Sequence, residues 1–547
     1  MLLHFLSFYF LPLFLFVLFL FLCFSLITTT PTDHKNLPPP SPRKLPIVGN
    51  LHQLGLFPHC SLRSLAQKYG PLMQLHFGSV PVLVVFSAVA AREIMKTHDL
   101  TFSSRPKTSI ATRLIYNSKD VAFSPYGEYW RQVRSICVLH LLSNRRVQSF
   151  RNVREEETAL MIEQIKHYSS SSSSSLVNLT DMFVTLTNNI VCRVALGRMY
   201  GGTKGGRRFK EILGMLGELV GAFNVGDYIP WLAWMNRING LDAKVESVFK
   251  EMDEFLEGVV EEHVDRRQRE GSDSVHIGSE SKYYFVDLLL QIQQENTAAR
   301  TIHRDTIKAL ILDMFGAGTN TIFTTMEWTM AELLKHPQIM KKLQNEVRKI
   351  GKGKLNITED DLENMYYLRA VIKESLRMHP SVPLLVPQES IQDAKVMDYD
   401  IVAGTQVTVN AWAIARDPLS WEDPEEFRPE RFLNSSTNFK GHNFEFIPFG
   451  AGRRGCLGIL FTVNVDELAL ASVVHKFNFS LPDGVSGKDL DMIEAVGSTI
   501  HKKKKNLKLL FQLLTLASVK KSAICFRAIC YISDSFFFFF EIYISDN

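Results

Sequence analysis

The sequence predicts a mainly α-helical fold with small β-sheets. Apolar residues recur three and four positions apart over much of the chain, which is the pattern of helices with one buried face. Only two stretches, residues 77–85 and 396–409, have the apolar, β-branched composition of strands. Hydrophobic residues make up 46% of the 547 positions, so the chain has ample material for a packed core.

Six segments carry the helical spacing. They are residues 128–142, 151–165, 177–196, 244–269, 304–334 and 337–349. Serines at 169–175 and the polar stretch 270–281 separate some of these segments, and we expect both to be surface loops.

Residues 1–29 form a predicted transmembrane anchor. The first 27 residues contain no Asp, Glu, Lys or Arg, and this run exceeds the roughly 20 residues that cross a bilayer. A cleaved signal peptide is the alternative, although its apolar core is shorter and ends at small residues. Lys35, Arg43 and Lys44 follow the run, so the positive-inside rule places the rest of the chain in the cytosol.

The sequence after the anchor divides into three predicted parts. Residues 30–50 are dense in proline, which gives a stiff, extended hinge. Residues 51–505 form the main domain. Residues 506–547 form an atypical C-terminal tail, which we interpret either as a second membrane-associating segment or as an altered transcript end.

Charge and cysteine content exclude several classes of protein. A net charge of +4 is too small to indicate nucleic-acid binding. The seven cysteines are scattered and form no CxxC pair, which argues against a disulfide framework and against a zinc cluster.

The most informative segment is the glycine- and arginine-rich loop at residues 449–458. Its four glycines allow the backbone to lie flat against a planar cofactor. Arg453 and Arg454 favour a thiolate at Cys456 and offer hydrogen-bond donors to carboxylates. A structural turn that holds a buried free cysteine is the alternative.

The spacing of Phe449, Gly452, Arg454, Cys456 and Gly458 resembles the haem-binding signature of the cytochrome P-450 superfamily. The resemblance implies that Cys456 is the axial thiolate on the iron of haem b. It also implies that Arg454 pairs with a haem propionate and that Phe449 covers the thiolate.

Two further motifs stand in the order that the superfamily shows. Trp130 and Arg134 match its Trp-x-x-x-Arg helix, which implies that both side chains donate to a propionate. Glu374, Arg377 and Arg431 match its buried charge triad, which implies a structural role beneath the haem. Taken alone, each of these pairs would be read as ordinary solvated charge.

One position on the predicted distal helix departs from the family pattern. In the superfamily an acid beside a threonine relays protons to bound oxygen, and Thr321 matches the threonine. Asn320 occupies the position of the acid, and an amide holds water but transfers no proton by ionising. Leu457 is a second departure, because similar plant members usually carry proline there.

The resemblance is closest to plant microsomal members of the seventy-one clan, subgroup A, and covers residues 37–501. It implies a cytochrome P-450 fold preceded by a transmembrane helix, in the endoplasmic reticulum membrane, with the catalytic domain on the cytosolic face. The implied reaction inserts one oxygen atom from O2 into a small lipophilic plant metabolite of terpenoid, phenylpropanoid or aldoxime type. NADPH-cytochrome reductase is the implied electron donor.

The substrate pocket and two alternative functions complete the sequence-based hypotheses. By position, we expect the pocket walls to include Phe223, Phe315, Leu384 and Leu385. One alternative is a haem-thiolate isomerase or dehydratase that needs no external electrons. The other is a catalytically impaired haem-binding membrane protein.

Overall fold

The computed structural model describes one compact unit within residues 1–513. The described residues are 12–19, 21, 37–171, 176–199, 204–270, 284–295, 302–482, 485–495, 497, 499–503 and 507–513. Most of the predicted anchor and all of the predicted tail beyond residue 513 lie outside them.

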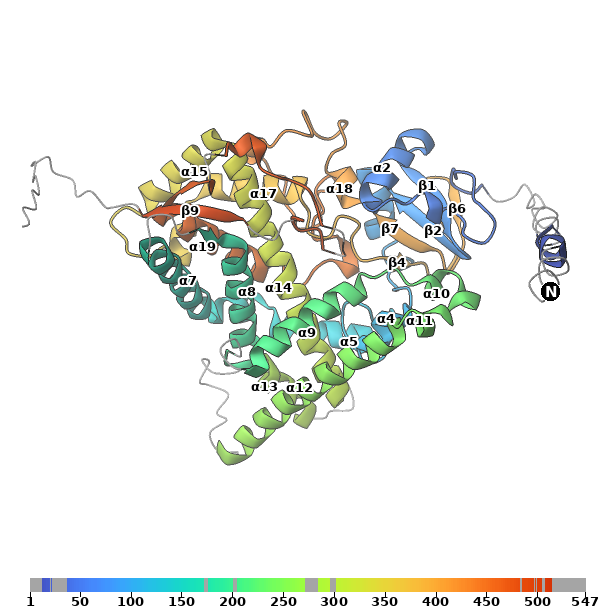
Figure 1. Ribbon diagram of the computed structural model, residues 1–547, viewed down its shortest axis with the longest axis horizontal. Coiled ribbons are helices and arrows are strands. Elements are labelled where there is room, and N and C mark those ends of the chain that lie inside the picture. The colour runs from blue at the N-terminus through green and yellow to red at the C-terminus, as the bar shows by residue number, and fades with distance from the viewer. Residues whose placement is uncertain are drawn as a thin grey trace, which may run out of the picture. The chain divides into compact units, whose positions relative to one another are not determined.

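Helices dominate the described chain, as the apolar spacing predicts (Figure 1). The longer helices are α2 (Pro58–Tyr69), α5 (Glu128–Ile136), α7 (Arg151–Ser171), α8 (Leu179–Leu196), α9 (Lys204–Val220), α12 (Leu241–Glu270), α13 (Phe285–Glu295), α14 (Arg304–Lys335), α15 (Pro337–Ile350), α17 (Tyr366–Met378) and α19 (Ile459–Lys476). Shorter helices are α3 (Ala88–Arg92), α4 (Ser109–Leu114), α6 (Asn144–Ser149), α10 (Val225–Tyr228), α11 (Met235–Ile238), α16 (Glu359–Leu362) and α18 (Ala411–Ile414).

The central element of the helical part is α14 (Figure 1). Most of its 32 residues are buried on several sides, which is typical of a helix surrounded by others. It packs against α8, α17 and α19. Asp305 in its first turn and Lys335 in its last turn complement the helix dipole.

Three small sheets accompany the helices in the described residues. The first has the order β1-β2-β7-β4, the second β3-β9-β8 and the third β5-β6. The strands are β1 (Leu72–Phe77), β2 (Val80–Val85), β3 (Val177–Asn178), β4 (Gln388–Glu389), β5 (Ala394–Val396), β6 (Tyr399–Ile401), β7 (Gln406–Val409), β8 (Phe477–Ser480) and β9 (Lys508–Leu513). The mainly α fold with small sheets is therefore confirmed.

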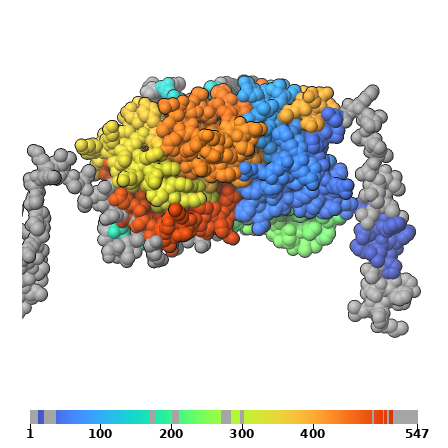
Figure 2. Space-filling model, turned by 90° about the horizontal axis from the view of Figure 1, so that it is seen from above, coloured from blue at the N-terminus to red at the C-terminus, as the bar shows by residue number. Residues whose placement is uncertain are grey.

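The first sheet joins segments that are far apart in the sequence. Strand β2 pairs in parallel with β7, so that Val82 lies opposite Gln406 and Val85 opposite Val409. On the surface, early and late parts of the chain, coloured blue and orange, also adjoin (Figure 2). The predicted hinge reaches this region too, because the Gln74 N–H donates to the Pro40 carbonyl at 2.9 Å.

The compact unit extends past the boundary predicted at residue 505. Strand β9 pairs with β3 and β8. Leu509 and Phe511 of this strand are buried, and so is Leu507, which directly precedes it. These positions alternate, which is the period of a half-buried strand. The first residues assigned to an atypical tail thus complete a sheet.

The predicted transmembrane helix lies largely outside the described residues. Residues 12–19 are helical and exposed. Within the described ranges, no single helix is both long and apolar enough to cross a membrane, and only the bent pair Glu211–Tyr228 with Pro230–Ile238 meets both criteria together.

Candidate active site

A cavity of about 300 Å³ lies between helix α14 and the loop that carries Cys456. Its volume is at the lower end of the roughly 300–1,000 Å³ typical of small-molecule sites. Apolar side chains cover much of its wall, including Leu310, Met314, Val382, Leu385 and Val386. Cys456 and Thr321 both line it, so the structure brings the predicted metal ligand and the predicted distal alcohol to one space.

The backbone of the cysteine loop depends on glycine at two positions. Gly450 and Gly452 have φ values of +69° and +66°, in the left-handed region that glycine tolerates. A Cβ on Gly452 would lie 2.2 Å from the Met95 carbonyl oxygen. The Cys456 N–H donates to the Phe449 carbonyl at 3.0 Å, which closes the loop and presents the thiol to the cavity.

The Cys456 thiol lies in a protein environment that disfavours the free thiolate. Burial raises the pKa of this thiol, whereas the Gly458 N–H, which donates to Sγ at 3.3 Å, and the charge of Arg134 act in the opposite direction. Cys456 is exposed to the cavity, so its sulfur is accessible to a cofactor bound there. A metal ion bound at sulfur deprotonates a thiol outright, so this site suits a metal-bound cysteine.

Three arginines face the same cavity. Arg105, Arg134 and Arg454 form no ion pair with a carboxylate in the described part of the chain, and they donate instead to backbone carbonyls. Burial, together with the like charges nearby, lowers the pKa of Arg454 to about 9. Burial and the charge of Arg134 lower the pKa of Arg105 to about 10.

This arginine cluster fits the predicted haem. A buried cation without a counter-ion is costly, and two propionates would supply the missing negative charge. The Cys456 thiol lies across the cavity from α14, and the three arginines lie at one end of it. The cavity therefore has the donor set for haem b. Cys456 would hold the iron, and Arg105, Arg134 and Arg454 would hold the carboxylates.

Trp130 has a different partner from the propionate that the sequence predicts. Its indole Nε1 donates to the Val121 carbonyl at 3.0 Å, and the residue is buried outside the cavity wall. The guanidinium carbon of Arg454 lies 4.0 Å from the Trp130 ring centroid, and that of Arg134 lies 5.3 Å away. Trp130 thus supports the two arginines by cation–π contacts.

The predicted charge triad is assembled between α17 and residues 428–431. Arg377 donates from Nε and Nη2 to the two Glu374 oxygens at 2.8 and 2.9 Å. Arg431 Nε donates to Glu374 Oε1 at 3.0 Å, and the Arg428 N–H reaches the same oxygen at 2.8 Å. Glu374 and Arg377 are fully buried, so their charges are balanced within the protein.

On the distal side, Thr321 and Asn320 point in different directions. Thr321 lines the cavity, and its Oγ1 donates to the Ala317 carbonyl at 2.5 Å. Asn320 does not line the cavity. A Cβ on Gly217 of α9 would lie 3.3 Å from its Nδ2, so the amide faces that helix. Gly318 has a packing role as well, because its Cβ would lie 3.2 Å from Val191 of α8.

Of the four predicted substrate contacts, only Leu385 lines the cavity. Phe223 lies on the surface with 57% exposure and stacks on Tyr228. Phe315 is buried in the main hydrophobic core, on another face of α14. Leu384 packs with a separate core beside the first sheet. Side chains that are adjacent in sequence, such as those of Leu384 and Leu385, point in different directions. Sequence position alone therefore did not identify which of them line the cavity.

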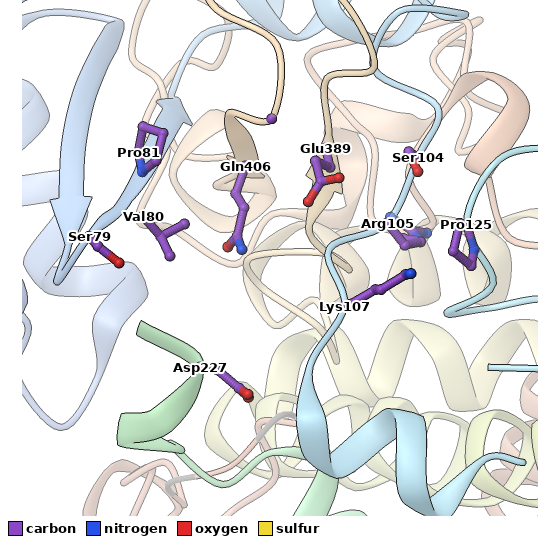
Figure 3. Close-up of a pocket in the computed structure, with 11 residues that line it drawn as sticks. Ser79, Val80, Pro81, Ser104, Arg105, Lys107, Pro125, Asp227, Glu389 and Gln406 are labelled. Atoms are coloured by element: carbon purple, nitrogen blue, oxygen red, sulfur yellow. The ribbon is translucent and has the colours of Figure 1, made fainter. Parts of the chain in front are cut away.

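A second cavity, of about 400 Å³, adjoins the site (Figure 3). It is polar and lies between the β1-β2 hairpin, the segment at 104–107 and α10, which contributes Asp227. Lys107 and Glu389 carry opposite charges on its wall. Arg105 lines both cavities and therefore separates the polar chamber from the apolar one.

Sequence reasoning missed four polar residues of the cavity region: Arg105, Asp120, Asp313 and Gln388. Arg105, Asp313 and Gln388 line the cavity, and Asp120 is fully buried beside it. Helical phase was the available signal for Asp313, which lies eight positions before Thr321 and thus on the same helix face. The other three lie in loops or at a strand, where no periodicity marks them.

Comparisons with known proteins agree with this geometry. Residues 39–511 match the family model "Cytochrome P450". Cytochrome P450 736A117 of Prunus mume is 58% identical over 480 residues, covering 87% of this chain and 90% of that protein. Norfluorocurarine oxidase of a Strychnos species is 56% identical over 479 residues, covering 88% and 93%.

A solved structure shows the same fold. The zebra fish cytochrome P450 with progesterone has a TM-score of 0.70 and 25% identity, and the match covers 84% of this chain and all of that one. The thiol and arginine donor set, the family match and the plant relatives agree, and the chain belongs to the cytochrome P450 family as a haem-thiolate monooxygenase.

Proposed function

We propose that this monooxygenase inserts one oxygen atom from O2 into a small lipophilic plant metabolite, of terpenoid, phenylpropanoid or aldoxime type, with electrons from NADPH. The observation that carries the proposal is the placement of Cys456 and Thr321 on one largely apolar cavity. Its wall suits an apolar ligand, because only a few polar groups interrupt it.

Haem supplies the oxygen activation, and the residues of this chain position it. Cys456 Sγ would be the metal ligand, and the Gly458 N–H donates to this sulfur. A thiolate ligand favours O–O cleavage. Arg105, Arg134 and Arg454 would hold the haem carboxylates. Across the cavity, the small side chain of Ala317 would leave room for a bound cofactor and its ligand, and the Thr321 hydroxyl can hold and pass a proton.

The cavity wall suggests how a substrate is oriented. Leu310, Met314 and Leu385 provide apolar contacts. Gln388 also lines the cavity, and its buried Oε1 has no hydrogen-bond partner in the described structure. An unpaired buried amide oxygen costs free energy unless a ligand donates to it, so we assign Gln388 a contact with a substrate hydroxyl.

A haem-dependent isomerisation or dehydration is the second candidate function. It is favoured by Asn320, which is not an acid and faces α9 instead of the cavity. Such a reaction consumes no NADPH and no O2. Measuring both alongside product formation distinguishes the two reactions, since oxygenation requires about one NADPH and one O2 for each product.

We propose NADPH-cytochrome reductase as the electron donor and the cytosolic face of the endoplasmic reticulum membrane as the location. Support comes from the apolar N-terminal run and from exposed aromatic and aliphatic side chains around α10 and α11. These are Phe223, Trp231, Trp234, Met235 and Ile238. Trp side chains favour the membrane interface. Alkaline extraction of microsomes tests the location, because an anchored chain stays in the pellet.

The test of the proposed function combines spectra with turnover. The full chain, reduced and treated with carbon monoxide, should show the thiolate-type Soret band. A ligand screen over terpenoids, phenylpropanoids and aldoximes should then identify compounds that shift the ferric spectrum. Reconstitution with the reductase should convert at least one of them to an oxygenated product. A Soret band at the position of a thiol or imidazole complex would contradict the proposal.

A further inference from the structure

Two buried aspartates meet at the cavity wall. Asp120, in the loop before α5, is fully buried, and Asp313 of α14 lines the cavity. The two carboxyl groups lie close together, because the consecutive N–H groups of residues 121–123 donate to one or the other of them. No N–H or hydroxyl group in the described structure donates to Asp120 Oδ1. Two buried carboxylates this close repel each other strongly when both are ionised, so we infer that the pair holds one proton.

The pair fixes three consecutive backbone N–H groups. The Val121 N–H donates to Asp313 Oδ2 at 2.8 Å. The N–H groups of Ala122 and Phe123 donate to Asp120 Oδ2 at 3.1 and 2.8 Å. Residues 121–123 are thereby attached to helix α14, which places Val121 and Ala122 on the cavity wall.

The carbonyl groups of the same short segment hold the arginine cluster. The Val121 carbonyl accepts from Trp130 Nε1 at 3.0 Å and from Arg454 Nη1 at 3.4 Å. The Ala122 carbonyl accepts from Arg105 Nε at 2.9 Å. A peptide group held at its N–H presents its neighbouring carbonyl in a fixed direction. The aspartates therefore control where these guanidinium groups point.

We propose that Asp120 and Asp313 are a proton-sharing positioning pair, which holds residues 121–123 on α14 and so aims Arg105 and Arg454 at the haem carboxylates. This inference rests on the haem-dependent function proposed above. It assigns a role in cofactor retention to two residues that touch neither the iron ligand nor the propionates in the arrangement described.

The charges around the pair make the shared proton important. Arg105 and Arg454 provide positive charge beside Asp120. Burial raises the pKa of Tyr129 to about 12 and raises that of Cys137, so both neighbours stay neutral. Lys119 and Asp305 form an ion pair nearby that adds no net charge.

Loss of the shared proton would weaken the attachment. Burial and the neighbouring carboxylate raise the pKa of Asp313 well above its usual range. A group whose folded-state pKa is raised stabilises the structure at low pH, and this contribution declines as the pH increases toward that pKa. At alkaline pH two adjacent carboxylates repel each other, and residues 121–123 should separate from α14.

The experiment measures haem transfer from the full-length holoenzyme to excess apomyoglobin. For the wild type we expect the transfer rate to rise about tenfold between about pH 5, where an ordinary aspartate is already ionised, and about pH 9, the upper range known for buried carboxyl groups. Asp313→Asn should transfer haem slowly at both pH values, because its amide both donates to Asp120 and accepts from Val121. Asp313→Leu should transfer haem rapidly at both.

Two further variants keep the inference open to contradiction even if Asp313→Leu does not fold. Asp120→Asn should abolish the pH dependence as Asp313→Asn does. Glu422→Gln, at a position that is 80% exposed and not among the charges around the pair, should retain the wild-type pH dependence. A wild-type pH dependence in Asp313→Asn would overturn the proposal, and so would a slow, pH-independent wild type.

The carbon monoxide spectrum separates this inference from the proposed function. All isosteric variants should keep the thiolate-type Soret band at neutral pH, because none changes Cys456. If the wild type itself lacks that band, the haem-thiolate function fails. If the band is present and the variants transfer haem at the same rate as the wild type at both pH values, only the positioning role fails.

Discussion

The two walls of the cavity are held in place by different forces. On the side that carries Cys456, the buried pair of Glu374 and Arg377 binds the partly exposed Arg431, and glycines at positive φ fix the cysteine loop. On the distal side, small residues of α14 line the space, and Thr321 bonds to its own helix. The ion pairs and glycines hold the metal ligand in a fixed position. The small side chains of α14, in contrast, leave room for oxygen and substrate.

The largest effect is expected on the proximal side, which carries Cys456, from Cys456→Ser. Serine is nearly the same size, but its hydroxyl is a poor ligand for haem iron compared with a thiolate. The reduced, carbon monoxide-bound spectrum should lose the thiolate-type band completely, and oxygenation should stop. Cys60→Ser is the matched control, because Cys60 is a free cysteine that does not line the cavity. An unchanged spectrum in Cys456→Ser would remove this residue as the ligand.

Glu374→Gln tests whether ion pairing fixes the proximal wall. Removing this carboxylate leaves Arg377 and Arg431 buried without a counter-ion, which costs about 3–5 kcal/mol. Denaturant unfolding of the holoenzyme should show that loss in the free energy of unfolding. Glu422→Gln is the control in the same region, since Glu422 is 80% exposed in its pair with Arg428. That change should cost no more than about 1 kcal/mol.

The same contrast explains what the sequence predicts well. The proximal residues lie in short motifs, where the spacing of Arg454 and Cys456 largely determines the local geometry. The long helices also follow from their apolar period, because α14 and α15 begin and end within a residue of the predicted limits. Local pattern and local structure coincide in these regions.

The distal wall and the cofactor cradle could be predicted only in part. On α14 the lining positions follow helical phase, so Asp313, Met314, Ala317 and Gly318 accompany Thr321, whereas Phe315 falls on another face. The contact between Asp120 and Asp313 joins residues far apart in sequence. Trp130 lies close to the predicted arginines, but its indole N–H donates to the Val121 carbonyl. The spacing of residues in the sequence does not specify that acceptor.

One buried carboxyl group on α19, the helix that follows the cysteine loop, lacks the ion pairs that Glu374 has. Asp466 of α19 is fully buried, and neither of its carboxyl oxygens has a hydrogen-bond partner in the described structure. Asp466→Val should therefore increase the free energy of unfolding by about 1–3 kcal/mol at neutral pH. Chemical denaturation of the holoenzyme measures this gain.

The pH dependence of that gain distinguishes its cause. Burial raises the pKa of Asp466 well above its usual range, so the folded state keeps a proton that the unfolded chain releases near pH 4. The wild type therefore loses stability as the pH rises above that value, up to the folded-state pKa. The advantage of Asp466→Val should grow from about pH 5 to about pH 8. An equal advantage at both pH values would indicate better packing instead of a removed carboxyl group.

The smallest effect is expected at the distal wall, where Thr321 and Asn320 can be compared directly. Thr321→Ala removes a hydroxyl group that faces the cavity, and we expect the fraction of NADPH electrons recovered in product to fall about tenfold, the equivalent of about 1.4 kcal/mol. Asn320→Ala removes an amide that faces α9, so the coupling should change by less than about twofold. Hydrogen peroxide release alongside NADPH consumption measures both. If the two substitutions reduce coupling equally, the Asn320 amide must reach the oxygen site during turnover. The α14 side of the cavity would then contribute a second polar group besides the Thr321 hydroxyl.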